Sequence, residues 1–470
     1  MSNMKSSDQA KRILYLFAPG GKITVVTKTD READSMHKRL ARTPPMGWNS
    51  WDCYGAAVNE EQLLANADYM AKYLKDYGWE YIVCDIQWSE PTAKSFYYNY
   101  FAPLCMDEYS RLIPSVERFP SSAGGKGFKP IADYIHSLGL KFGIHIMRGI
   151  PRQAAHQNTK IKCEGVTARD IAHPSSICGW NPDMYGLFTE KKGAQEYYDS
   201  IFELYASWDV DYIKCDDIAN TEIFPHNPYS ARREIEMIRS AIDKCGRPMV
   251  LSLSPGPAPV WEHEHLAAHA NMWRMTGDFW DEWSKLYAMF ERCHAWQEYV
   301  QPGAWPDCDM LPLGRIQKTE ELPEYRNRYT RFTHDEQITM MTLWGIFRSP
   351  LMMGGEMREN DDFTLSLLQN RELIDMLKKS SGARQFKREE TDGKGEIIWT
   401  STGENCKYVA LFNTDDQQRE ICFDITDISI GGVDYRVWDM WKHEEHAVTR
   451  GKFSAKVNPH GARLFKITVK

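Results

Sequence analysis

The segment VDYIKCDD, which ends at Asp217, places three charged side chains directly after an apolar run. The apolar part predicts a buried strand that ends at two adjacent carboxylates, Asp216 and Asp217. Because side chains on a strand alternate between its two faces, Lys214 and Asp216 point to the same side. If that side is the interior of a barrel, the pair belongs to an active site. On a solvated edge, the two would be ordinary surface charges.

A second carboxylate, Asp278, follows Arg274 by four residues in the aromatic segment WRMTGDFW. Two carboxylates that face each other across a cleft suit glycoside hydrolysis, which needs a nucleophile or base and a proton donor. Asp216 is expected to stay ionised beside Lys214, as a nucleophile must. The aromatic neighbours of Asp278 can raise its pKa, which suits the acid.

Apolar strand-like runs alternate with helical patterns through most of the chain, and this alternation decides where the carboxylates lie. The expected strands are 44–51, 81–88, 141–147, 210–215, 248–254, 269–274, 304–310 and 350–354. The expected helices are 60–77, 131–138, 193–208, 230–244, 283–296 and 333–347, with a last one near 365–379. Eight such units predict a closed (β/α)8 TIM barrel, an α/β fold whose active site lies at the carboxyl ends of the strands.

Polar and aromatic side chains gather at those strand ends. They are Trp51, Asp85, His145, Lys214, Asp216, Asp217, Ser254, Arg274, Asp278, Asp307 and Asp309. A single aspartate at such a place more often caps a helix or bonds to a loop than it catalyses. The convergence of several on one barrel rim favours a site.

The rest of the chain predicts two further parts. Residues 1–40 form a polar leader around a possible hairpin, 12–17 and 22–27, whose turn is Pro19-Gly20-Gly21. The barrel is expected over 41–380. Residues 381–470 contain short alternating segments that predict a separate antiparallel β-sandwich, with strands at 396–400, 408–413, 420–423, 435–439 and 462–469.

Composition limits the class of protein. The 470 residues are 42% hydrophobic and 26% charged, as expected of a globular chain. A net charge of −8 without a basic run makes nucleic acid and anionic membranes poor partners, and no apolar stretch reaches the ~18–20 residues that span a bilayer. Eleven cysteines without CxxC pairs indicate reduced thiols and a cytoplasmic location. The expected partner is a small glycoside or oligosaccharide. These patterns are compatible with a homo-oligomer but do not determine the oligomeric state.

A metal-dependent barrel hydrolase is the competing enzyme class. Its ligands would be His145, Asp216 and Asp278, but neither an HxH nor an HExxH spacing includes His145. No metal and no cofactor is therefore predicted. A carbohydrate-binding protein that has lost catalysis is a third possibility, and the presence of both aspartates speaks against it.

Three ordered segments, MGWNSW (46–51), YIKCDD (212–217) and WRMTGD (273–278), resemble the signature segments of glycoside hydrolase family 27, the α-galactosidase family. The likeness runs from about residue 42 to the C-terminus. It implies a (β/α)8 barrel followed by a β-sandwich, and hydrolysis with retention of anomeric configuration.

By position, the resemblance puts the nucleophile on Asp216 and the acid/base on Asp278. It assigns sugar binding to Trp51, Lys214 and Arg274, and the expected sugar-binding set also includes Asp85, Ile86, His145 and Ser254. The tyrosine of the family's third strand is His145 here. The family's cysteine two residues past the nucleophile is Ile218, so its common active-site disulfide is missing, which fits a cytoplasmic enzyme.

One departure from the family pattern bears on the substrate. Family galactosidases carry two consecutive aspartates on the second strand for the 4- and 6-hydroxyls of galactose, whereas this chain has Asp85-Ile86. Ile86 offers no acceptor and adds bulk where a hydroxymethyl group would sit. β-L-Arabinopyranose shares the ring stereochemistry of α-D-galactose but lacks that group. The sequence therefore favours a retaining β-L-arabinopyranosidase, with α-galactosidase as the alternative.

Overall fold

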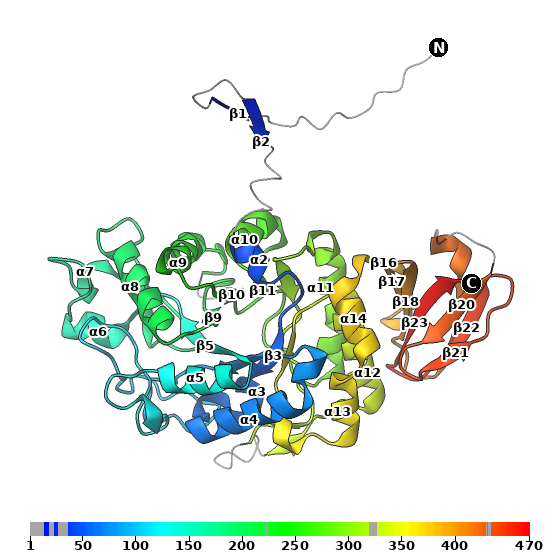
Figure 1. Cartoon of the computed structure of the whole chain (residues 1–470), viewed down its shortest axis with the longest axis horizontal. Helices are drawn as coiled ribbons and strands as arrows, with labels where there is room; N and C mark the ends of the chain where they lie inside the picture. The colour runs from blue at the N-terminus through cyan, green and yellow to red at the C-terminus, as the bar shows by residue number, and fades with distance from the viewer. Residues whose placement is uncertain are drawn as a thin grey trace.

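The computed structural model describes residues 14–17, 23–26, 36–221, 224–318, 327–428, 430 and 434–470. They form a parallel sheet curled into a barrel and ringed by helices, with an antiparallel β-sandwich beside it (Figure 1). The fold predicted from the sequence is confirmed.

Eight strands build the barrel in the order β12-β11-β10-β9-β5-β4-β3-β15, and every neighbouring pair is parallel. They are β3 (Met46–Asn49), β4 (Tyr81–Cys84), β5 (Lys141–Met147), β9 (Tyr212–Asp216), β10 (Val250–Leu253), β11 (Met272–Arg274), β12 (Trp305–Asp307) and β15 (Leu351–Met353). Leu311, just after β12, donates to Met352 O at 2.8 Å and accepts from Gly354 N at 2.9 Å. These bonds close the ring.

Alternation along each strand sorts side chains between the barrel interior and the helix layer. An apolar interior cluster combines residues of six strands, among them Tyr81, Tyr212 and Trp305, whereas Ile213 and Cys215 pack outward against the helices. Lys214 and Asp216 follow Tyr212 at intervals of two and share its face. Of the two alternatives for that face, a barrel interior or a solvated edge, the structure shows the barrel interior.

The helices cover the outside of the barrel, and most of them turn one apolar face toward the strands. They include α4 (Glu60–Tyr73), α5 (Lys129–Ser137), α8 (Ala194–Ser207), α9 (Arg232–Cys245), α11 (Trp283–Trp296) and α12 (His334–Phe347). The exception is α12, which lies between the barrel and the sandwich and is buried on nearly all sides. In α9, Ile235, Ile238 and Ile242 are buried at helical spacing. Capping boxes at Asn59 and Thr333 fix the starts of α4 and α12.

The barrel differs from the sequence prediction in several places. The predicted strand 269–274 begins only at Met272, because His263–His269 forms a short helix, α10, after the proline-rich turn. The predicted helix 365–379 is two helices, α13 (Asp362–Leu368) and α14 (Arg371–Lys379), since the Asn370 side chain caps the second by accepting from Leu373 N. A small sheet of β6 (Ile150–Pro151), β7 (Ala172–Ile177) and β8 (Met184–Leu187) was not predicted.

All five predicted strands of the sandwich are present, and three more are added. One sheet contains β16 (Ser381–Thr391), β17 (Lys394–Gly403), β18 (Cys406–Asn413), β23 (Ala462–Val469), β20 (Tyr435–Asp439) and β21 (Glu444–His446); the other pairs β19 (Arg419–Asp424) with β22 (Lys452–Val457). The sandwich lies against α12 (Figure 1). Thr339 Oγ1 of α12 donates to His460 O, and the ring of Trp283, the first residue of α11, stacks on His460 at 3.8 Å.

The N-terminal strands β1 (Leu14–Phe17) and β2 (Ile23–Val26) pair antiparallel, as predicted for the hairpin. The predicted turn Pro19-Gly20-Gly21 lies outside the described residues. Within the described ranges, none of the helices is both long enough and apolar enough to cross a membrane.

Candidate active site

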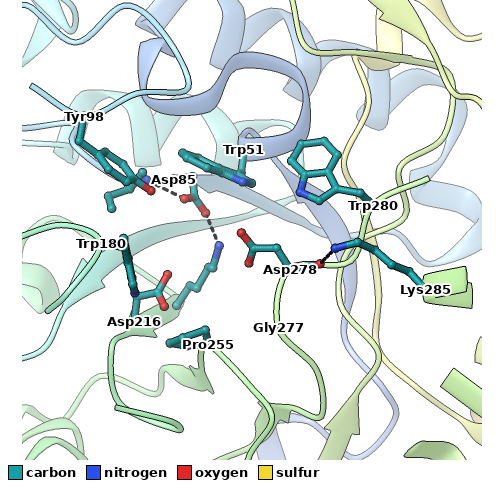
Figure 2. Close-up of a pocket in the computed structure, with 12 residues that line it drawn as sticks. Trp51, Asp85, Tyr98, Trp180, Asp216, Pro255, Gly277, Asp278, Trp280 and Lys285 are labelled. Atoms are coloured by element: carbon teal, nitrogen blue, oxygen red, sulfur yellow. Dashed lines mark hydrogen bonds and ion pairs between the residues drawn. The ribbon is translucent and has the colours of Figure 1, made fainter. Parts of the chain in front are cut away.

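A pocket of about 360 Å³ opens at the carboxyl ends of the barrel strands. Its lining consists of Trp51, Asp85, Ile86, Tyr98, Trp180, Lys214, Asp216, Pro255, Gly277, Asp278, Trp280 and Lys285. Figure 2 shows the carboxylates of Asp85, Asp216 and Asp278 around the centre of the pocket, with aromatic rings on opposite sides.

Asp216, the last residue of β9, is fixed and ionised. His145 Nε2 on β5 lies 3.0 Å from Asp216 Oδ2, and Asp217 N donates to Oδ1 at 3.1 Å. Burial acts to raise the pKa of Asp216, but the hydrogen bond from His145 and the charges of Lys214 and Arg274 outweigh it and hold the pKa well below the usual range. Asp216 therefore presents a charged carboxylate to the pocket.

Lys214 and Asp85 form a buried ion pair across the barrel, with Nζ 2.8 Å from Oδ2. Asp85 also accepts from Asn49 Nδ2 and from Ile86 N, both at 2.8 Å. Burial opposes the charge on each partner, yet Asp85 raises the pKa of Lys214 and Lys214 lowers that of Asp85. The pair offers a cation and an anion side by side, which suits the hydroxyls of a sugar.

Asp278 lies in the loop after β11 and has a more open setting. Arg274 Nη2 donates to its Oδ1 at 3.0 Å, and its side chain is 57% exposed. Its carboxylate points into the pocket in Figure 2. Of its aromatic neighbours, Trp280 lines the pocket, whereas Phe279 is buried in the core.

Arg274 lies beneath the pocket and joins Asp278 to a buried acidic layer. Its Nη2 is 3.0 Å from Asp309 Oδ2 as well as from Asp278. Burial raises the pKa of Asp307 to about 7, with the charge of Asp309 adding to the effect. Burial likewise raises the pKa of Asp309 to about 6, against the lowering effect of Arg274.

A second buried network lies behind Asp216. Arg148, which follows β5, makes ion pairs at 2.9 Å with Asp217 and with Glu234 of α9. The Tyr198 hydroxyl donates to the other oxygen of Glu234 at 2.6 Å. Asp217 has a φ of 54°, in the left-handed region, so this network holds an uncommon backbone turn next to Asp216.

One wall of the pocket is apolar. Ile86 is only 3% exposed and belongs to a cluster with Ala56, Ala93, Met147, Cys178 and Met184. The rings of Trp51, Tyr98 and Trp180 pack against this cluster, and Tyr98 lies 6.0 Å from Trp51 and 5.6 Å from Trp180 between ring centroids.

The structure brings most of the predicted site residues together. Trp51, Asp85, Ile86, Lys214, Asp216 and Asp278 line the pocket, and His145 and Arg274 stand behind the two carboxylates. Ser254 does not line it: its Oγ donates to Cys215 O, and the next residue, Pro255, faces the pocket instead.

Six residues that line the pocket were not predicted from the sequence: Tyr98, Trp180, Pro255, Gly277, Trp280 and Lys285. Tyr98 and Trp180 come from long connections without periodicity, so no local pattern marks them. Trp280 is different, because it lies in the same aromatic segment as Asp278 and that proximity was a usable signal.

A metal-dependent hydrolase would need His145, Asp216 and Asp278 to lie close enough together to bind one ion. In the described ranges, the only group of three or more possible ligands with their atoms within 4.8 Å of one another is Asp133, His136 and Asp209. His145, Asp216 and Asp278 do not form such a group. Lys129 already pairs with both aspartates of the group that does exist.

Comparisons with known proteins agree with this fold. Residues 186–379 match the family model described as alpha galactosidase A, and 393–467 match its C-terminal beta sandwich domain. The α-galactosidase of Cyamopsis tetragonoloba is 27% identical over 97% of this chain and 95% of its own length.

Solved structures give a higher similarity. The GH27 β-L-arabinopyranosidase of Geobacillus stearothermophilus is 54% identical, covering 93% of this chain and 98% of its own, with a TM-score of 0.88. An aspartate-to-alanine variant of that enzyme in complex with arabinose is 53% identical over 93% of this chain and 100% of its own, with a TM-score of 0.89.

Proposed function

Because the chain belongs to glycoside hydrolase family 27, the family of the α-galactosidases, and is a retaining glycosidase, we propose that it releases terminal β-L-arabinopyranose from glycosides. One observation carries the choice of sugar. The Asp85–Lys214 pair, which suits ring hydroxyls, stands directly beside the apolar wall of Ile86, where a hydroxymethyl group finds no acceptor. The arabinose complex of the Geobacillus relative supports a sugar substrate.

In this proposal, Asp216 attacks the anomeric carbon and Asp278 protonates the leaving oxygen. A covalent glycosyl-enzyme forms, and Asp278, now a carboxylate, accepts a proton from the water that hydrolyses it. The bonds of Asp216 to His145 and to Asp217 N suit a nucleophile that must stay charged and in place. The exposure of Asp278 suits a group that exchanges protons with the leaving group and with water.

The remaining site residues divide by distance from the sugar. We assign direct sugar contacts to Trp51, Asp85, Ile86 and Lys214, which line the pocket. His145 and Arg274 act on the sugar through the carboxylates that they contact. Ser254 supports the β9 to β10 edge of the site.

The apolar wall discriminates by desolvation and by shape. Galactose would bury a 6-hydroxyl without a partner, at a cost on the order of 1–3 kcal/mol. Steric overlap adds to this, so a preference of roughly ten- to a thousandfold for the pentose is expected.

The test is a comparison of kcat/KM for nitrophenyl β-L-arabinopyranoside and nitrophenyl α-D-galactoside. We expect the arabinopyranoside to be favoured at least about tenfold. Equal values, or a higher value for the galactoside, would instead assign the chain to the α-galactosidases, the alternative function.

We also propose that residues 41–380 form the catalytic unit, that 381–470 form a separate supporting domain, and that the enzyme works in the cytoplasm. All eleven cysteines are free thiols, which suits a reducing compartment. Ile218 is buried where other family members carry the cysteine of their disulfide.

A further inference from the structure

The cations around the pocket differ in how their charge is balanced. Lys214 pairs with Asp85, and Arg274 pairs with Asp278 and Asp309. Lys285 also lines the pocket, but its Nζ donates to the backbone oxygen of Asp278 at 2.9 Å and forms no ion pair with any carboxylate of the described residues. Among the described residues, one positive charge therefore faces the pocket without an anionic partner.

The acids closest to Lys285 in the sequence do not supply that partner. Asp281 is engaged by Arg328, whose Nη2 donates to Asp281 Oδ1 at 2.9 Å. Glu282 is exposed at the start of α11 and forms no ion pair with Lys285 within the described part of the chain. The ammonium group is thus available to a ligand.

Lys285 and Trp280 lie on the leaving-group side of the pocket. Figure 2 shows both on the opposite side of Asp278 from Asp85, the partner of Lys214. A general acid must reach the glycosidic oxygen, so the leaving group lies next to Asp278 when the released sugar lies against Asp85 and Lys214. Trp280 is half-buried and is held edge-to-face by Phe96, with 6.3 Å between the ring centroids.

We propose that Trp280 and Lys285 form a leaving-group subsite for a sugar that carries a carboxylate, that is, a uronic acid unit. Its ring stacks on the indole of Trp280 and its carboxylate accepts from Lys285. The inference rests on the proposed roles of Asp216 and Asp278 but not on which sugar is released. A carboxylate is favoured over a hydroxyl because a charge-assisted hydrogen bond is about twice as strong as a neutral one.

The experiment uses two substrates that differ in one group. The same released sugar is linked to glucuronic acid or to glucose, so that only the carboxylate changes. We expect the intact enzyme to favour the glucuronate by about tenfold to a hundredfold in kcat/KM, and Lys285→Met to bring this ratio close to one. The preference should also shrink as ionic strength rises.

Lys192→Met is the matched control. Lys192 likewise donates to a backbone oxygen, that of Glu164 at 3.2 Å, but it does not line the pocket. Its replacement should leave the ratio unchanged. An intact enzyme that does not discriminate, or a Lys285→Met variant that loses both activities equally, would overturn the proposal and leave Lys285 only the role of holding the Asp278 loop.

A failure of the proposed function gives a different result. Both leaving groups are tested on β-L-arabinopyranosyl and on α-D-galactosyl substrates, and the ratio is read from whichever pair is cleaved. Inhibition of nitrophenyl glycoside hydrolysis by free glucuronate and by free glucose gives a second measurement. Stronger inhibition by glucuronate, lost in Lys285→Met, supports the subsite, and equal inhibition contradicts it.

Discussion

The ends of β9 and β11 carry the two carboxylates of one pocket in opposite surroundings. The Asp216 side chain is 12% exposed, touches His145, and has the buried network of Arg148 behind it. The Asp278 side chain is 57% exposed and lies in a loop, with Arg274 as its side-chain partner. The same residue type is thus buried and fixed at the end of one strand, and exposed in the loop that follows the other.

The difference shows how a barrel assigns roles to like residues. A side chain at the end of a strand inherits the rigidity of the sheet and the charges of neighbouring strands, here Lys214 and His145. A side chain in the following loop has solvent on one side. A nucleophile needs the first setting, and a group that gives and takes protons needs the second.

Replacement of Asp216 should give the largest effect. Asp216→Asn keeps the shape but removes the nucleophile, so kcat on both nitrophenyl glycosides should fall by about 10⁴-fold or more. Retention of activity within about a hundredfold would contradict the assignment. Asp216→Gly with azide sharpens the comparison, since azide attack from the vacated side should give a glycosyl azide of inverted anomeric configuration.

Replacement of Asp278 should have an effect that depends on the leaving group. Asp278→Asn should lower kcat/KM for disaccharides by about 10²–10⁴-fold, and much less for nitrophenyl glycosides, whose leaving group needs little protonation. With Asp278→Gly, azide should give a product of retained configuration. Equal losses on both substrate classes would mean that the roles of the two carboxylates are not separate.

Lys214→Met should remove the cation that Asp216 and Asp85 share. Loss of a charged hydrogen bond to the sugar predicts a roughly ten- to hundredfold fall in kcat/KM. Lys141→Met is a suitable control, because Lys141 pairs with the half-exposed Glu80 at the opposite end of β5. Normal kinetics for Lys214→Met would show that the side chain does not contact the substrate.

Ile86→Asp tests the apolar wall of the pocket, which contains neither Asp216 nor Asp278. A polar acceptor there should move the ratio of kcat/KM toward the galactoside by about tenfold. Ile86→Val, which keeps the wall apolar, should leave the ratio close to that of the native enzyme. Because Ile86 packs within its cluster, protein stability is measured alongside, and an unmoved ratio in a folded Ile86→Asp variant would reject Ile86 as a determinant of specificity.

The smallest expected effect concerns stability in the acidic layer beneath Asp278. The pKa of Asp307 is raised from 3.8 to about 7 in the folded state, so its contribution to stability is full below 3.8 and is lost as the pH rises through about 7. Asp307→Asn, which is neutral throughout and can still accept from Asp309 N, should therefore raise Tm on the order of 1–3 °C at about pH 8.

The same substitution should give no gain at about pH 4, where Asp307 is already mostly protonated. Asp375→Asn is the control, because that side chain is 61% exposed on α14. A lower Tm for Asp307→Asn at about pH 8 would show that the charged form is the one that the fold stabilises.

The sequence by itself determined the barrel and the central pair of the site. The eight strands are visible because each is an apolar run followed by polar residues, and a helical pattern separates most of them. Lys214 and Asp216 were placed on one face by the two-residue period of a strand, and that rule needs no knowledge of other elements. The hairpin strands and the five predicted sandwich strands followed from the same kind of local pattern.

Only the tertiary structure decided which distant residues meet that pair. Tyr98 and Trp180 come from long connections, Lys285 comes from the helix after the Asp278 loop, and no local period links them to β9. Tertiary packing also turned Arg274 toward Asp309 and Ser254 toward Cys215. Periodicity fixes side-chain direction within one element. Contacts between elements depend on how the loops fold back over the strands, and on which charges must be paired in the buried acidic layer of Asp307 and Asp309.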